Sequence, residues 1–282
     1  MKEKYSMILK GLFMKQLLVI GLLTIFSSFF ACNMQNNSTA TESADVPQIT
    51  ANPQPENVSN KDKTPVLVEL FTSEGCSSCP PADKVLAQLE KEQSNKNAEI
   101  ITLALHVDYW DNIGWKDEFS SALYSQRQSV YGQAFKLRQV DTPQMVVDGQ
   151  KQFVGSNLSE ANKAITESAK IEKANIELTN EENNLKIKIS DIPTHENASV
   201  FLAIAEDNLS TSVKGGENSG RKLEHTSVVR ELKSIGFVTP QQNSLEAETT
   251  VQMQPNWKRE NLKFVVFVQE NGTRRILGVN RI

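Results

Sequence analysis

The sequence predicts an α/β domain over residues 63–173, followed by an all-β, sandwich-like domain over residues 174–282. In the first range, apolar runs of strand length alternate with segments whose apolar residues recur at helical spacing, which is typical of a sheet covered by helices. In the second range, short strand-like runs are separated by clusters of Gly, Asn and Asp. A chain of 282 residues is long enough for two domains of about 100–200 residues each.

The composition fits a soluble globular protein and gives no sign of a nucleic-acid partner. Apolar residues make up 39% of the chain and charged residues 23%, the usual range for globular proteins. The net charge is -4 and the pI about 5.6, whereas nucleic-acid-binding proteins concentrate Lys and Arg on one face. The sequence contains no nucleophile elbow, P-loop, H-E-x-x-H motif or dinucleotide fingerprint.

Residues 1–32 have the pattern of an export signal. Four lysines precede an almost unbroken apolar stretch over residues 17–30, which is shorter than the about 20 residues that span a bilayer. The segment Phe29-Phe30-Ala31-Cys32 resembles a lipoprotein cleavage site, so Cys32 would carry the lipid and anchor the chain to the membrane. The alternative is ordinary signal cleavage near Ala31, with Cys32 incidental.

Residues 33–62 are rich in Asn, Ser, Thr, Gln and Pro and contain almost no large apolar residue. Such a segment cannot bury enough apolar surface to offset its ordering entropy. It therefore reads as a disordered tether between the membrane and the folded part. We expect an exported protein of the cell envelope, on the periplasmic side or at the outer membrane.

The first domain begins with a buried strand over residues 66–71. Pro80 and Pro81 mark a helix start, because Pro is tolerated where the first helical N–H groups need no partner, and the helix runs to about Gln93. A second strand covers residues 100–107, and a second helix runs from Glu118 to about Lys136. An Asp148-Gly149 turn predicts a hairpin of residues 144–147 and 153–155. A last helix covers residues 158–171, with Ser156 or Asn157 as its N-cap.

The second domain consists of strand-like runs at 176–178, 185–189, 200–205, 213, 228–229, 247–251 and 264–268. Apolar and polar residues alternate strictly from 185 to 189, so that strand has one solvated face. Regular short strands of this kind favour a β-sandwich.

Cys76 and Cys79 form a C-x-x-C pair between a strand and a helix start. A helix N-terminus carries a positive partial charge, which stabilises a thiolate, the nucleophile of disulfide exchange. Cys76 is the outer residue and is expected to attack a substrate disulfide, while Cys79 resolves the mixed disulfide. The later Thr142-Pro143 is awkward as the opening of a strand, so a cis bond is expected there.

These features resemble the thioredoxin superfamily. Three longer blocks resemble more closely a bacterial secreted family of unknown function, the domain of unknown function numbered twelve twenty-three. They span residues 69–83, 106–111 and 142–149, and a fourth, interrupted block spans residues 216–230. The resemblance covers about Thr64 to the C-terminus and implies a thioredoxin-like fold and export. It also implies that Pro143 faces the cysteines and that Thr142 offers backbone groups to an incoming peptide.

Several residues near these blocks are candidates for supporting roles. Glu69 matches the buried thioredoxin acid if the loop before Cys76 has one extra residue, and could relay a proton from Cys79; the alternative is an exposed strand residue. His106 and Asp108 share a strand face that would flank the pair, or simply end the strand. Aromatic residues of the following loop would line a peptide groove or serve packing: Tyr109, Trp110 and Trp115. Glu217, Asn218, Arg221 and His225 are expected to pin their loop or contact the first domain.

We expect a thiol–disulfide oxidoreductase that acts on protein thiols and disulfides of the cell envelope and needs no organic cofactor. One rival is a binding or assembly lipoprotein whose C-x-x-C is a structural disulfide. A local bridge of this kind adds little chain constraint, which counts against it. Another rival is a copper or zinc carrier with His106 as third ligand, although two cysteines supply only half a zinc site.

Overall fold

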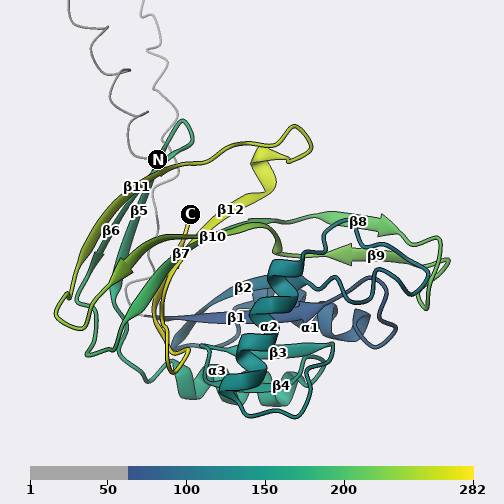
Figure 1. Ribbon diagram of the computed structural model, residues 1–282, viewed down its shortest axis with the longest axis horizontal. Coiled ribbons are helices and arrows are strands. Elements are labelled where there is room, and N and C mark those ends of the chain that lie inside the picture. The colour runs from purple at the N-terminus through teal and green to yellow at the C-terminus, as the bar shows by residue number, and fades with distance from the viewer. Residues whose placement is uncertain (1–62) are drawn as a thin grey trace, which may run out of the picture. The chain divides into compact units, whose positions relative to one another are not determined.

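The computed structural model describes residues 63–282, and its first half contains the predicted order of strands and helices (Figure 1). The elements are β1 (Thr64–Thr72), α1 (Pro80–Glu92), β2 (Ala98–His106), α2 (Ala122–Ala134), β3 (Gln144–Val147), β4 (Lys151–Val154) and α3 (Leu158–Ser168). The predicted signal peptide, Cys32 and the tether lie outside the described residues. Within residues 63–282, no helix is long and apolar enough to cross a membrane.

The second half is built from strands and one short 3₁₀ turn, Arg259–Asn261. The strands are β5 (Asn175–Glu181), β6 (Asn184–Ser190), β7 (Ala198–Glu206), β8 (Leu209–Ser212), β9 (Lys222–His225), β10 (Val228–Val238), β11 (Leu245–Thr250), β12 (Leu262–Glu270) and β13 (Ile276–Arg281). The predicted alternation at residues 185–189 is confirmed, because Leu185, Ile187 and Ile189 are buried while the residues between them are exposed.

The prediction of a thioredoxin-like α/β domain followed by a separate all-β sandwich is wrong. One mixed sheet of eight strands runs through both halves in the order β13-β12-β7-β10-β2-β1-β3-β4. The halves join where Val228 of β10 pairs with Ala104 of β2, and Ala104 N donates to Ser227 O at 2.8 Å. Strands make up 40% and helices 18% of the described part. Local periodicity identifies strands, but it does not identify the strand that pairs with the open edge of β2.

Strands β1 and β2 lie side by side in the interior of this sheet (Figure 1). They are parallel, with Thr64 opposite Ala98 and Thr72 opposite His106. Because the two strands are parallel and in register, their carboxyl ends lie next to each other, at the point where the loop to α1 leaves β1. This arrangement brings the Cys76–Cys79 segment next to the end of β2.

Three apolar clusters hold these layers together. Helices α1 and α3 pack on the sheet face that carries Val66, Val68 and Leu70. Helix α2 packs on the opposite face, which carries Leu67 and Phe71. The three-stranded sheet β11-β6-β5 packs on β7, β12 and β13 through a third cluster. Alternate residues of β1 thus face different helices, which decides where each polar side chain of the strand points.

The hairpin and the helix cap that the sequence predicts are both present. Strands β3 and β4 pair in antiparallel register around Asp148 and Gly149, whose φ angles are 48° and 68°. A side chain at Gly149 would place its Cβ 1.8 Å from the Arg274 carbonyl oxygen, so glycine is required there. The Asn157 side chain caps α3 by accepting from Glu160 N.

Candidate functional site

The two cysteines lie in the loop that joins β1 to α1. Cys79 is the N-cap of α1, and Pro80 and Pro81 are the first helical residues, as predicted. Cys79 N donates to Cys76 O at 3.2 Å, and the N–H groups of Ala82 and Asp83 donate to Cys79 O. Both cysteines are free thiols. The pair therefore sits in the positive field of the helix N-terminus.

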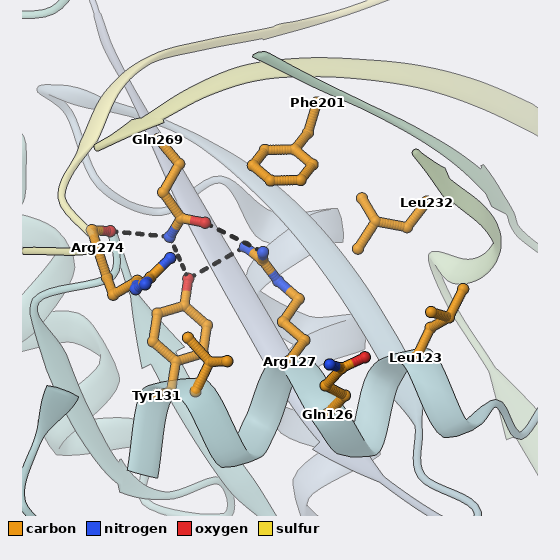
Figure 2. A pocket seen from close by; sticks show the side chains of 9 residues that line it. Leu123, Gln126, Arg127, Tyr131, Phe201, Leu232, Gln269 and Arg274 are labelled. Atoms are coloured by element: carbon orange, nitrogen blue, oxygen red, sulfur yellow. Dashed lines mark hydrogen bonds between the residues drawn. The ribbon is translucent and has the colours of Figure 1, made fainter. Parts of the chain in front are cut away.

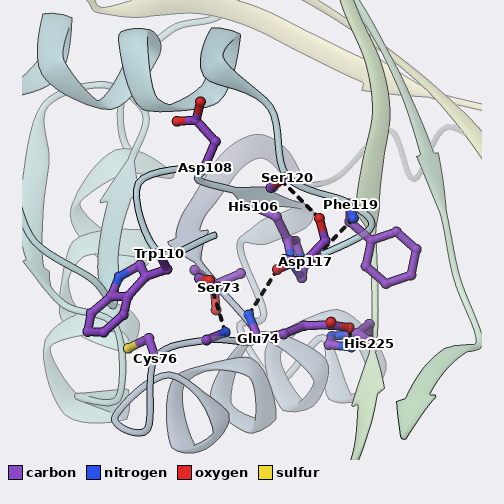
Figure 3. Close-up of polar contacts among 12 residues, drawn as sticks. Ser73, Glu74, Cys76, His106, Asp108, Trp110, Asp117, Phe119, Ser120 and His225 are labelled. Carbon is purple, nitrogen blue, oxygen red and sulfur yellow. Dashed lines mark hydrogen bonds and ion pairs between the residues drawn. The ribbon is translucent and has the colours of Figure 1, made fainter. Parts of the chain in front are cut away.

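Cys76 has hydrogen-bonding partners on two sides. Its Sγ lies 3.2 Å from Ser78 Oγ and donates to the Thr142 carbonyl oxygen at 3.8 Å. Its side chain is nevertheless almost fully buried, with 1% of the residue exposed. Figure 3 shows the indole of Trp110 beside the Cys76 sulfur. A substrate disulfide can reach Cys76 only if this cover moves.

The two thiols differ in acidity. The Cys79 thiol, as hydrogen-bond donor, lowers the pKa of Cys76 to about 6, against the opposing effect of burial and with help from Ser78. Burial raises the pKa of Cys79, and its bond to Cys76 raises it further. Cys76 is therefore the nucleophile of the pair near neutral pH, and Cys79 keeps its proton.

Thr142 and Pro143 lie where the sequence analysis placed them. The Thr142-Pro143 peptide bond is cis, as expected, and the Thr142 carbonyl faces Cys76. Trp110 Nε1 donates to Thr142 Oγ1 at 2.8 Å, which fixes the indole over the pair. A cavity of about 330 Å³ opens beside Ser78, Thr142 and Pro143 and reaches the edge strand β4.

The prediction that Glu69 relays a proton from Cys79 is wrong. Glu69 shares a face of β1 with Leu67 and Phe71, opposite α1, so it points away from the cysteines. It is buried and accepts two bonds from Arg127, at 2.6 and 3.0 Å, and one from Tyr131. It is therefore part of an ion pair between β1 and α2. It is also not the exposed strand residue of the alternative, because only 1% of it is exposed.

A buried polar cluster lies behind the loop, at the end of β2 (Figure 3). His106 Nδ1 lies 2.7 Å from Asp117 Oδ2, and the same oxygen accepts from Glu74 N at 2.9 Å. Glu74 in turn contacts His225 Nε2 at 3.0 Å and accepts from Trp115 Nε1 at 2.7 Å. The two imidazole rings meet edge to face with centroids 5.2 Å apart. The cluster thus joins β2, the loops on either side of it and β9.

Asp83 links this cluster to the cysteines. It lies four residues after Cys79 on α1, so both side chains are on one helix face, and its Oδ1 accepts from Thr72 Oγ1 at 2.8 Å. Burial raises the pKa of Asp83, although the positive fields of His106 and His225 oppose the shift. The Asp83 charge in turn contributes to the raised pKa of Cys79. A cavity lined by Pro80, Asp83 and residues of β9 connects this carboxyl with solvent.

His106, expected either to flank the cysteine pair or to end its strand, lies in the buried cluster at the end of β2. It is 1% exposed and pairs with Asp117. Among the described residues, its Nε2 has no hydrogen-bond partner. Within residues 63–282, no three His, Cys, Asp or Glu side chains are arranged to hold a metal ion. The structure therefore does not place His106 as a third ligand beside the two cysteines.

A loop from the second half of the chain holds the cysteine segment, as the sequence analysis expected. Asn218 is fully buried, and its Nδ2 donates to Glu74 O and Cys76 O, both at 2.8 Å. Glu217 Oε2 accepts from Ser77 N at 3.0 Å, and Arg221 Nη1 donates to Asn218 Oδ1 at 3.1 Å. The backbone around Cys76 is thus fixed by residues about 140 positions away.

The neighbouring loop residues mainly hold the loop itself. Asp108 Oδ1 accepts from Ser125 Oγ of α2, and Tyr109 OH donates to Gln128 Oε1 at 3.1 Å. Trp115 packs against Gly216 and bonds to Glu74. Of the three aromatic candidates for a groove, Trp110 lies beside Cys76, Tyr109 is close enough to Thr142 and Cys79 to be influenced by both, and Trp115 bonds to Glu74.

Comparison with known families matches residues 67–269 to a family described as Protein of unknown function (DUF1223). This chain belongs to that family. The matched range includes every residue of the site described above. A search of curated proteins found no match.

This DUF1223 chain matches several solved structures, among them the following two. A crystal structure of a protein from Agrobacterium tumefaciens has a TM-score of 0.64 and 23% identity, covering 78% of this chain and 94% of that one. At this identity the likeness concerns the fold alone. A domain of the outer membrane lipoprotein Omp28 from Porphyromonas gingivalis has a TM-score of 0.25 and 18% identity, covering 40% of this chain and 88% of that one.

Sequence reasoning missed several polar partners in this DUF1223 protein. Asp83 could have been found, because its spacing of four from Cys79 places both on one helix face. Asp117 and Arg127 carried no local sign, since each meets its partner only through the packing of a loop or of α2.

Proposed function

We propose that this DUF1223 protein is a thiol–disulfide oxidoreductase whose reactive pair is Cys76 and Cys79. The observation that carries the proposal is the contrast between the two thiols at the N-terminus of α1. Cys76 has its pKa lowered to about 6, while the pKa of Cys79 is raised. A nucleophilic thiolate next to a protonated resolving thiol is the pair that disulfide exchange requires. The proposal includes a relationship with the thioredoxin superfamily, which rests on the C-x-x-C pair at the N-terminus of α1 and the cis Thr142-Pro143 bond.

The exchange proceeds in two displacements. The Cys76 thiolate attacks one sulfur of a substrate disulfide, forms a mixed disulfide and releases the other substrate sulfur as a thiolate. Cys79 then loses its proton and attacks Cys76 Sγ, which releases the second substrate thiolate. The substrate disulfide is reduced and the Cys76–Cys79 disulfide is formed. Under oxidising conditions the same steps run in reverse.

Asp83 is our candidate acceptor for the Cys79 proton, in place of Glu69. It lies one helical turn from Cys79, and its charge contributes to the raised pKa of that thiol. A carboxyl group whose pKa is raised by burial is a better proton acceptor than an ordinary carboxylate. The cavity at Pro80 and Asp83 would let the proton pass to solvent.

The substrate side of the site is formed by Trp110, Thr142 and Pro143. The cavity beside Thr142 could accept an extended segment of a substrate protein. Trp110 must swing away from Cys76 before attack, since the thiol is almost fully buried. That burial is the one observation that favours the rival function, an inert structural bridge.

We also propose that the protein acts in the cell envelope, anchored by a lipid on Cys32. The sequence pattern of residues 1–32 supports this location. Cys32→Ser should move the protein from the membrane fraction to the soluble fraction of expressing cells. Unchanged membrane association of the variant would remove the lipid anchor from the proposal without affecting the chemistry at Cys76.

The pH dependence of Cys76 alkylation tests the proposed chemistry. Only the thiolate reacts, so a lowered pKa predicts that the rate rises with pH through about 6 and is level above pH 7. The reduced full-length protein is treated with iodoacetamide, and the modified cysteine is identified by mass. Cys76→Ser should abolish the fast reaction. A rate that keeps rising to pH 9, as for an ordinary thiol, would contradict the proposal.

A further inference from the structure

A third cavity, lined by none of the site residues around the cysteines, lies between α2 and the sheet strands of the second half (Figure 2). Its volume is about 240 Å³, and residues of α2, β7, β10 and β12 line it. The apolar part of its wall consists of Leu123, Val130, Phe201 and Leu232. Leu123 is 60% exposed at its rim. A mainly apolar cavity with a few convergent polar groups is typical of a small-molecule site.

The first cation of this cavity, Arg127, is already neutralised. Its guanidinium donates two hydrogen bonds to the Glu69 carboxylate and one to Gln269 Oε1, the last at 3.0 Å. It also lies over the rings of Tyr131, Phe201 and Phe267, at 5.2 to 5.5 Å. Glu69 thus balances the charge of Arg127, and the guanidinium of Arg127 is already occupied by partners within the protein.

The second cation, Arg274, has no such partner. Within the described range 63–282, its guanidinium has neither a hydrogen bond nor a carboxylate partner. Partial burial lowers the pKa of Arg274, Tyr131 opposes this shift, and repulsion by Arg127 adds to it. An anion bound in the cavity would supply the counter-ion that Arg274 lacks.

The position of Arg274 is fixed by its backbone. Arg274 N donates to Glu270 O at 3.1 Å, and its carbonyl accepts from Gln269 Nε2 at 2.9 Å. Its φ of 66° is in the left-handed region, and Gly149 lies so close that no side chain fits between them. The turn between β12 and β13 thus presents Arg274 to the cavity on a rigid support (Figure 2).

We propose that this cavity binds a small monocarboxylate with an apolar body, whose carboxylate pairs with Arg274. The fork of a guanidinium matches the two oxygens of a carboxylate. The apolar body would lie against Phe201 and Leu232 and cover Leu123 from solvent. The single unpaired charge of Arg274 matches one carboxylate, and the small apolar volume of the cavity matches a short chain or a ring. This site is independent of the cysteine chemistry.

Calorimetric titration of the full-length protein with hexanoate tests the proposal. Hexanoate should bind saturably, and hexan-1-ol, which has the same chain without the charge, should bind at least about tenfold more weakly. Hexylamine should not bind, because Arg274 would repel it. The absence of saturable hexanoate binding, or equal affinity for hexanoate and hexanol, would overturn the proposal.

Variants then locate the site. Arg274→Gln should weaken hexanoate binding by at least about tenfold and leave hexanol binding unchanged, while Arg274→Lys should give an intermediate loss. Arg138→Gln, at an exposed arginine outside the cavity, is the matched control and should bind hexanoate like the wild type. Val130→Trp should fill the cavity and remove binding of both ligands. Wild-type affinity in Arg274→Gln would overturn the assignment even if hexanoate binds elsewhere.

Discussion

Two buried polar clusters flank strand β1, one on each face of the sheet. On the α2 face, Glu69 meets Arg127 and Tyr131 in an ion pair in which both carboxylate oxygens are bonded. On the α1 face, the Asp83 cluster consists of Glu74, Asp83, His106, Asp117 and His225, and His106 Nε2 has no partner in the described part of the chain. The first cluster is closed and paired, whereas the second has spare proton-binding capacity close to Cys79.

This difference separates a structural role from a chemical one. A fully satisfied ion pair stabilises one arrangement and gives no group that can change its protonation cheaply. The Asp83 cluster contains a carboxyl whose pKa is raised and an imidazole whose pKa is raised by Asp117 against the larger opposing effect of burial. We therefore assign stability to the Glu69 pair and proton transfer to the Asp83 cluster.

Of the substitutions considered, the one with the largest expected effect is at Glu69, in the closed cluster with Arg127 and Tyr131. Glu69→Ala leaves the buried Arg127 charge without its partner, which should reduce the free energy of unfolding by about 3–5 kcal/mol. Urea denaturation of the full-length protein measures it. The double variant Glu69→Leu/Arg127→Met should be less destabilised than Glu69→Ala, because no charge is left unpaired. A loss below about 1 kcal/mol in Glu69→Ala, the value of a surface pair, would break the comparison.

The second-largest effect is expected at Asp83, on the rate at which the Cys76–Cys79 disulfide closes. Asp83→Asn removes the proton acceptor, so closure of the Cys76–Cys79 disulfide from a mixed disulfide should slow by about 100-fold. Acid-quenched samples of a mixed disulfide with a small thiol give this rate. Glu92→Gln, at an exposed carboxylate on the same helix, is the control and should close like the wild type. If Asp83→Asn closes within about twofold of the wild-type rate, Asp83 has no role in proton transfer.

The smallest effect is expected at the cover over Cys76. Trp110→Ala removes the indole and its bond to Thr142, which should increase Cys76 alkylation at pH 8 about tenfold, the equivalent of one hydrogen bond. Trp110→Phe keeps a ring and should show a smaller increase. Alkylation of Cys76 that is unchanged in Trp110→Ala would mean that another group limits access.

The sequence allowed the cysteine segment to be placed correctly because its rules are local. Two prolines fix the start of α1, so Cys79 must precede the helix. The cis bond at Thr142-Pro143 and the hairpin at Asp148-Gly149 follow from equally short patterns. A contact of the Asn218 loop with the first half of the chain was one of two alternatives for that loop, and the structure shows it at the cysteine segment.

The two errors, the role of Glu69 and the division into two domains, share one cause. The hydrophobic pattern of a strand does not show which segments pair with it or pack on it. Glu69 is one residue from positions that face α1, so the choice of face depends on which helix covers it. The sequence predicts two separate domains, but β10 of the second half pairs with the open edge of β2. The two halves therefore share one sheet. In both cases the missing information is the packing of segments far apart in the chain.

The measurement closest to the central claim is a glutathione redox titration of the full-length protein, read by thiol alkylation and mass. Active exchange predicts that Cys76 and Cys79 share one midpoint between about -270 and -120 mV, the span of thioredoxin-like catalysts. A pair that stays oxidised well below about -300 mV would be a structural disulfide, and the assignment of oxidoreductase activity to this site would be wrong.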